Sequence, residues 1–238
     1  MYKNLQRNLS SHFEFDTQEW RDIFVSVLVL GFVLSFREWG VSEVSVVAGV
    51  SSWVLSSVLM FLVLILYLSV VKSVAIWKGY KAQFKTGLPV LAAAVFIAFM
   101  FEGGLVFLVP GGLYFSVLKN AKLGKLWQDI EYRNFGYIGI VGALVLVILA
   151  ALVVPFSSIL VFQKLIFICL VFAMYTLLPV PYNPGFYLLV TSFLSFSFLL
   201  MFVTIASLFV FLELGLIYSL IMALLCGLCA WGLTYKYL

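Results

Sequence analysis

Few side chains in this sequence could carry out chemistry at an active site. The chain has one histidine, His12, and three cysteines, of which Cys226 and Cys229 are about one helical turn apart while Cys169 stands alone. A zinc site needs three or four ligands, and these two thiols have no further ligands nearby. We therefore interpret the cysteines as small hydrophobic residues and not as metal ligands. No glycine-rich phosphate loop and no serine–histidine pair is available in the apolar segments. We therefore predict no enzyme activity, no cofactor and no bound metal.

Three charged residues interrupt the apolar segments and form a second group of candidates: Glu102, Lys164 and Glu213. Charged groups within a membrane are functional candidates by default, so Glu102 raises the alternative of a transporter or a proton-handling protein. Each residue also has an interfacial explanation, because Lys164 can extend to the membrane surface, Glu213 can mark a turn, and Glu102 can reach water from a hairpin tip. The sequence has no internal repeat of the kind that many transporters contain.

The composition places these residues in a membrane. Hydrophobic residues make up 65% of the 238 residues and charged residues only 10%, with a mean hydropathy of +1.18. A soluble domain of this size could not cover so much apolar surface. The net charge of +4 is spread over loops, where membrane orientation accounts for it and no nucleic-acid partner is indicated. We predict an integral protein of the cell membrane.

The apolar segments predict an all-α polytopic membrane protein with about six transmembrane helices and a re-entrant or hairpin element. Glu102-Gly103-Gly104 and Pro110-Gly111-Gly112 interrupt the hairpin segment, residues 88–118, and basic loops flank it on both sides, so both loops and both termini are predicted to be cytoplasmic. Residues 1–22 form a predicted cytoplasmic arm and residues 23–238 a single transmembrane domain. The predicted helices span about residues 23–36, 44–71, 135–155, 159–178, 186–211 and 214–231.

A basic stretch lies between the second predicted helix and the hairpin. Lysines at positions 72, 78, 81 and 85 alternate with the aromatic residues Trp77, Tyr80 and Phe84. This pattern is typical of an amphipathic segment at a membrane surface, and an ordinary cytoplasmic loop explains it equally well.

Five short strings occur in a particular order along the chain. They are residues 13–22 (FEFDTQEWRD), 79–84 (GYKAQF), 110–114 (PGGLY), 142–146 (GALVL) and 178–185 (LPVPYNPG). In order and residue types they resemble the archaeal branch of the site-2 protease family, which consists of intramembrane zinc metalloproteases. The resemblance covers most of residues 13–190 and implies a site-2-protease-like helical fold that could grip a transmembrane helix.

The positions to which the resemblance assigns zinc chemistry hold other residues in this chain. The histidines of the family's HExxH motif align with Tyr67 and Val71, and its general-base glutamate aligns with Leu68. The third ligand, an aspartate, aligns with Pro184, and the asparagine that is implied to polarise the scissile carbonyl aligns with Leu146. These groups neither bind zinc nor activate water. The sequence therefore predicts a pseudoprotease, a relative of the family without catalytic activity.

The resemblance also implies where such a relative would bind a partner. Pro179, Pro181, Asn183 and Gly185 lie in the proline-rich string that contributes to substrate contact in the family, and Glu102 lies at the predicted hairpin break. We predict an accessory or scaffold subunit of a hetero-oligomeric membrane complex, which binds other integral membrane proteins and lipids. Small residues on the second predicted helix allow close helix approach, either to a partner or within the bundle: Ala48-Gly49, Ser51-Ser52 and Ser56-Ser57.

Overall fold

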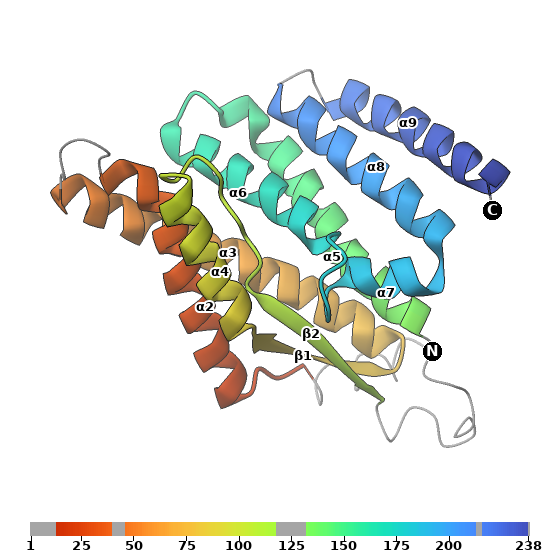
Figure 1. Cartoon of the computed structure of the whole chain (residues 1–238), viewed down its shortest axis with the longest axis horizontal. Coiled ribbons are helices and arrows are strands. Elements are labelled where there is room, and N and C mark those ends of the chain that lie inside the picture. The colour runs from red at the N-terminus through yellow and green to blue at the C-terminus, as the bar shows by residue number, and fades with distance from the viewer. Residues whose placement is uncertain (1–12, 40–45, 118–131, 213–215, 238) are drawn as a thin grey trace.

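The chain folds into a bundle of helices with one small sheet at one end (Figure 1). The computed structural model describes residues 13–39, 46–117, 132–212 and 216–237. The two strands in this described part are β1 (Tyr80–Thr86) and β2 (Gly111–Val117). The helices are α2 (Thr17–Ser35), α3 (Val46–Trp77), α4 (Leu88–Met100), α5 (Tyr132–Val153), α6 (Leu160–Thr176), α7 (Pro184–Thr191), α8 (Phe193–Phe211) and α9 (Leu216–Tyr237), with short 3-10 turns η1 (Phe36–Trp39) and η2 (Val154–Phe156).

Three of these helices are long and apolar enough to cross a membrane. They span residues Val46–Trp77, Asn134–Phe156 and Phe193–Phe211, and each has the length and hydropathy that a bilayer requires. Shorter apolar helices cover Leu88–Met100, Leu160–Thr176 and Ile221–Tyr235. The helices support the prediction of a membrane protein with transmembrane helices, whereas six crossings stay a prediction.

The prediction of an all-α fold is wrong in one respect, because β1 and β2 form an antiparallel sheet. Their register runs from Tyr80 opposite Val117 to Thr86 opposite Gly111. In β1 the side chains of Tyr80, Ala82 and Phe84 are buried while the residues between them are more exposed, which is the alternation of a half-buried strand. The hairpin element is therefore β1–α4–β2, and the basic stretch supplies its first strand.

Both outer edges of this sheet are covered by the same chain. The backbone N–H of Phe84 donates to Glu19 Oε1 at 2.8 Å, and that of Thr86 donates to Asp22 Oδ2 at 3.2 Å. On the other edge the N–H of Leu113 donates to the carbonyl oxygen of Tyr182 at 3.0 Å. These bonds satisfy backbone groups that an open strand edge would leave unpaired.

Helix α2 starts earlier than predicted and packs closely on α3. It begins at Thr17, because Asp16 and Glu19 form a capping box. In this box the side chain of each residue accepts a hydrogen bond from the backbone N–H of the other. Along the α2–α3 contact, a methyl group added to Gly31 would lie 2.1 Å from Ser57 Oγ. In the same way, Gly49 lies against the indole of Trp39. Gly49 and Ser57 of α3 therefore serve internal packing, one of the two alternatives left open above, whereas Ala48 and Ser51 are exposed.

Two predicted helix boundaries are wrong. The sequence predicts that the second helix ends at about Val71, but α3 continues to Trp77, so Lys72 lies inside the helix. The predicted helix over 186–211 is instead α7 followed by α8, with a break at Ser192, whose φ of −158° is not helical. Ser192 Oγ accepts a hydrogen bond from the Ser195 N–H and so caps α8.

Candidate functional site

The positions aligned with the HExxH motif lie in the packed centre of the bundle. Tyr67, Leu68 and Val71 are all buried on α3. A methyl group added to Gly142 of α5 would lie 2.6 Å from Tyr67 Cε2 and 2.9 Å from Val71 Cγ2, so only glycine permits this approach of the two helices. Leu146, one turn further along α5, is fully buried. Aliphatic and aromatic groups therefore fill this centre.

The proline-rich segment divides into an exposed and a buried half. Pro179 and Pro181 are exposed, and Tyr182 adopts a positive φ of 67°. Asn183 is buried, and its Nδ2 donates to the carbonyl oxygen of Tyr175 at 3.3 Å. The following residue, Pro184, starts α7 and lies so close to α5 that a methyl group on Gly139 would be 2.1 Å from its Cγ. Only the second half of the segment thus faces the centre.

Tyr67, Asn183 and Pro184 meet around one small cavity. Phe84 of β1 and Leu113 of β2 line it as well, and α6 contributes further walls. The ring of Tyr67 also packs edge-on against Phe172, with the ring centroids 5.1 Å apart. The cavity volume is about 20 Å³, which is room for about one water molecule. The structure thus brings three of the five strings and an HExxH-aligned position together at one point.

Gly185 supports this arrangement through its lack of a side chain. A methyl group added there would lie 2.0 Å from the carbonyl oxygen of Leu177, so the turn from α6 into α7 closes only with glycine at this position. Gly185 is therefore a structural residue of the turn, and whether it binds a partner stays a prediction.

Glu102 lies far from this centre in the fold. It is exposed in the turn after α4, where its φ of 51° and the φ of 72° at Gly103 reverse the chain. A methyl group on Gly103 would lie 2.9 Å from the backbone nitrogen of Arg37 in η1. The turn therefore packs at the end of α2 that is opposite to the sheet. Transport through Glu102 stays a prediction, and Glu213 lies outside the described residues.

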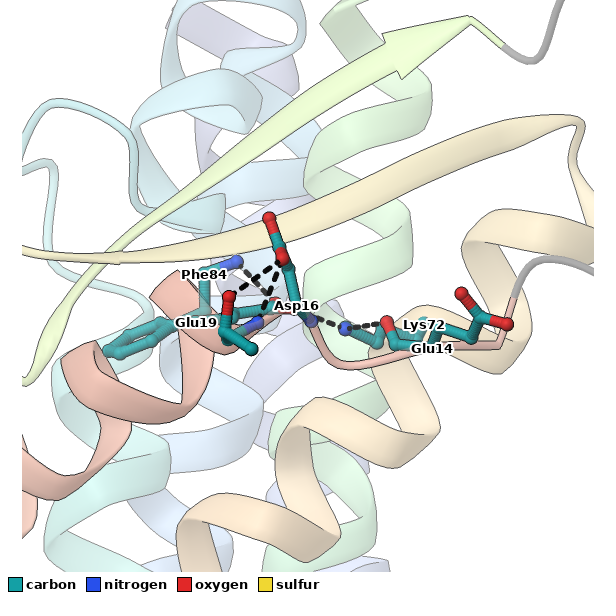
Figure 2. Close-up of polar contacts among 6 residues, drawn as sticks. Glu14, Asp16, Glu19, Lys72 and Phe84 are labelled. Atoms are coloured by element: carbon teal, nitrogen blue, oxygen red, sulfur yellow. Dashed lines mark hydrogen bonds and ion pairs between the residues drawn. The ribbon is translucent and has the colours of Figure 1, made fainter.

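A buried ion pair at the sheet end was not predicted from the sequence. Lys72 Nζ lies 2.6 Å from Glu19 Oε2, with side chains that are 5% and 4% exposed (Figure 2). The other carboxylate oxygen accepts the N–H of Phe84, and Lys72 also donates to the carbonyl oxygen of Glu14 at 2.9 Å. The ammonium lies 3.8 Å from the ring centroid of Phe15. The pair therefore joins the N-terminal arm, α2, α3 and β1.

A second ion pair lies at the opposite end of the bundle. Lys164 Nζ is 2.5 Å from Glu38 Oε1 and donates to Ser52 Oγ at 2.7 Å. Burial pushes the pKa of the Glu38 carboxyl upward, but hydrogen bonds to Lys164 and Ser52 outweigh burial, so this pKa lies below its ordinary value. The carboxylate therefore stays charged at neutral pH. Lys164 also lines a cavity of about 410 Å³, which we name the outer cavity.

A third feature is an apolar groove between α5, α8 and α9, which we name the lateral groove. Its volume is about 510 Å³. At one point it contains a polar pair, in which Tyr137 Oη and Ser195 Oγ are 3.0 Å apart. The groove is lined by Tyr137, Ile140, Val141, Leu144, Ser195, Phe198, Leu199, Leu228 and Trp231.

The zinc ion of the site-2 proteases does not fit the residues at the centre. Tyr67, Val71 and Pro184 offer no imidazole, thiolate or carboxylate, which are the ligands that zinc prefers. Within the described ranges, no group of three or more histidine, cysteine, aspartate or glutamate side chains lies close enough to hold a metal ion.

Comparison of the chain with models of protein families, with curated proteins and with solved structures found no match. The resemblance to site-2 proteases accordingly stays a hypothesis, which rests on the five strings and on their positions in the fold.

Proposed function

We propose that this chain is a non-catalytic integral membrane protein, built on the plan of the site-2 proteases, that binds a transmembrane helix of a partner protein. It acts as an accessory or scaffold subunit of a larger membrane complex. The observation that carries the proposal is the lateral groove, because a wide apolar groove between three helices offers a docking surface for a further helix.

The packed centre supports the absence of catalysis in this proposal. Hydrolysis of a peptide bond inside a membrane needs a group that activates water and a group that stabilises the developing charge. Around Tyr67 the walls are mostly aromatic and aliphatic, and the amide of Asn183 already donates to Tyr175. A cavity of about 20 Å³ also leaves no room for an extended peptide or a lipid chain.

The lateral groove suits a helix better than it suits a small ligand. Its walls are mainly large aliphatic and aromatic side chains, such as Ile140, Phe198 and Leu228, and the one polar pair is satisfied internally by Tyr137 and Ser195. Between helices in lipid, affinity comes from close packing, with few polar contacts. The proposed partner is therefore an apolar helix with small residues on its docking face.

The charge distribution supports the proposed orientation of the chain, with its sheet end in the cytoplasm. In the described part of the chain, Arg21, Lys72, Lys78, Lys81 and Lys85 lie at the sheet end, and the sequence between β2 and α5 adds three more lysines. The opposite end has Arg37 and Lys164. A majority of basic residues marks the cytoplasmic side, so the sheet end is proposed to face the cytoplasm.

Co-purification from native membranes tests the proposed function. The chain and two groove variants, Val141→Trp and Leu228→Trp, are extracted in mild detergent, and the proteins retained at constant ratio are identified by mass spectrometry. Val54→Trp is the matched control, because Val54 is also apolar and exposed, on α3 and outside the groove. We expect a stoichiometric membrane partner with the unmodified chain and with the control, and loss of that partner with both groove variants.

Two results would contradict the proposal. One is that the unmodified chain is isolated without any partner at constant ratio. The other is that the groove variants retain the partner as well as the control does.

A further inference from the structure

The outer cavity combines polar and apolar walls in a way that the lateral groove does not. Its lining includes apolar residues such as Leu34 of α2 and Val210 of α8, together with the polar residues Ser56, Ser157, Gln163 and Lys164. The cavity lies between the α2–α3 pair and the α6–α8 pair, at the end of the bundle that contains η1 and η2. Its volume of about 410 Å³ falls in the range of ordinary ligand sites.

The ammonium of Lys164 lies near the start of α6 and has hydrogen-bonding capacity to spare. Lys164 is four residues after Leu160, where α6 begins, so it lies about 6 Å below the start of that helix at 1.5 Å per residue. Glu38 and Ser52 occupy part of its hydrogen-bonding capacity. An ammonium has three N–H donors, which leaves one donor for an oxygen atom of a bound molecule.

We propose that the outer cavity binds one membrane phospholipid. The phosphate and ester oxygens lie on the side of Lys164, Gln163 and Ser157, and one acyl chain follows the apolar side along Leu34 and Val210. This assignment uses both kinds of wall, and it places the charged headgroup where a cation is already held. It does not depend on the helix-binding function, because it uses a different cavity.

The lining of the outer cavity suits a lipid better than an apolar helix. Ser157, Gln163 and Lys164 offer hydrogen-bonding groups to a headgroup, whereas the walls of the lateral groove are mainly aliphatic and aromatic. We therefore assign a lipid to the outer cavity and a helix to the lateral groove.

Native mass spectrometry of the full chain in mild detergent, with phosphatidylglycerol titrated in, tests the proposal. The unmodified chain is expected to bind one phospholipid. Val210→Trp fills the apolar side and is expected to abolish this binding, and Lys164→Met is expected to weaken it about tenfold, because a charge-assisted bond to phosphate is lost. Val141→Trp in the lateral groove is the matched control and keeps the lipid.

Glu38→Gln gives a readout that a purely structural ion pair would not give. This substitution removes the competing carboxylate, so Lys164 is freed for the phosphate and the lipid binds several-fold more tightly than in the unmodified chain. If Glu38 and Lys164 only held the fold together, both Glu38→Gln and Lys164→Met would weaken binding. Only folded charge states are counted, so a loss of folding in one variant does not imitate a loss of binding.

Inorganic phosphate separates a lipid from a free anion. Millimolar phosphate is expected to leave the bound phosphatidylglycerol in place, because the apolar side contributes to affinity. The proposal is overturned if the unmodified chain binds no phospholipid above the level of Val210→Trp, if Lys164→Met and Glu38→Gln change binding in the same direction, or if phosphate alone displaces the lipid.

Discussion

The two ion pairs of this protein differ in how completely the chain encloses them. At the sheet end, Glu19 and Lys72 are almost fully buried and have further hydrogen bonds to Phe84 and Glu14. At the opposite end the Lys164 side chain is 21% exposed and that of Glu38 44%, beside a cavity. A fully satisfied buried pair fixes the arrangement of several elements, whereas a partly exposed pair leaves a cation available to a ligand. One end therefore serves the fold and the other is suited to binding.

The largest expected effect is at the buried pair. Lys72→Met leaves the Glu19 carboxylate buried without its cation, so we expect a loss of about 3–5 kcal/mol in the free energy of unfolding. Chemical denaturation in detergent micelles measures this loss. The double variant Glu19→Gln with Lys72→Met removes the unpaired charge and is expected to recover a large part of it. Equal stability of the single variant and the unmodified chain would contradict the assigned role of the pair.

The packed centre is the next most sensitive region. Gly142→Ala places a methyl group against Tyr67 and Val71, and we expect a loss of about 1–3 kcal/mol from overpacking. Gly232→Ala in α9 is the matched control, because no atom lies within 4 Å of its added methyl group. There the higher helix propensity of alanine predicts unchanged or slightly increased stability. Similar losses at both glycines would argue against close packing at Tyr67.

The exposed pair is expected to have a smaller effect on stability. Because Glu38 is half-exposed, Glu38→Gln is expected to cost at most about 1 kcal/mol. The pKa of Glu38 is lowered in the folded chain, so its stabilisation is present above its unfolded pKa of about 4.3 and is lost as the pH falls through the folded pKa. Melting temperatures between pH 3 and pH 7 measure this: the difference between the two proteins should shrink toward the acid end. A difference that is independent of pH would contradict the ion pair.

The smallest expected effect is at the hairpin turn. Glu102 has a positive φ, which costs a residue with a Cβ atom more than it costs glycine. Glu102→Gly is therefore expected to change stability by less than about 1 kcal/mol, in the stabilising direction. Thermal unfolding measures the change, with Glu102→Gln as the control for the loss of charge alone. A clear destabilisation by both variants would show that the carboxylate makes a contact of its own.

The sequence predicts the helical membrane class well and its small sheet poorly. Long apolar segments are visible without a structure, because a bilayer requires them. The strand Tyr80–Thr86 was overlooked because its lysines resemble a surface segment, although Tyr80, Ala82 and Phe84 alternate with a period of two. The predicted end of α3 is wrong for a related reason. A lysine after an apolar segment suggests a helix end at the membrane surface, but Lys72 is buried within the helix because Glu19 neutralises its charge.

The candidate sites depend on contacts between distant parts of the chain. The approach of Gly142 to Tyr67 and of Gly139 to Pro184 joins segments that are far apart in sequence, and no local pattern signals it. The two larger cavities arise from packing between helices, so neither could be derived from hydropathy. The sequence shows Lys164 as a charge in an apolar segment, but only the fold shows that Glu38 is its partner.

Site-specific photo-crosslinking in native membranes tests the central claim most directly, namely that a partner helix docks in the lateral groove. A photoreactive amino acid is placed at Val141 or Leu228 in the groove, or at Val54 outside it. The account predicts one and the same membrane protein crosslinked from both groove positions and not from Val54. Crosslinks to lipid alone at the groove positions, or the same products from all three positions, would contradict it.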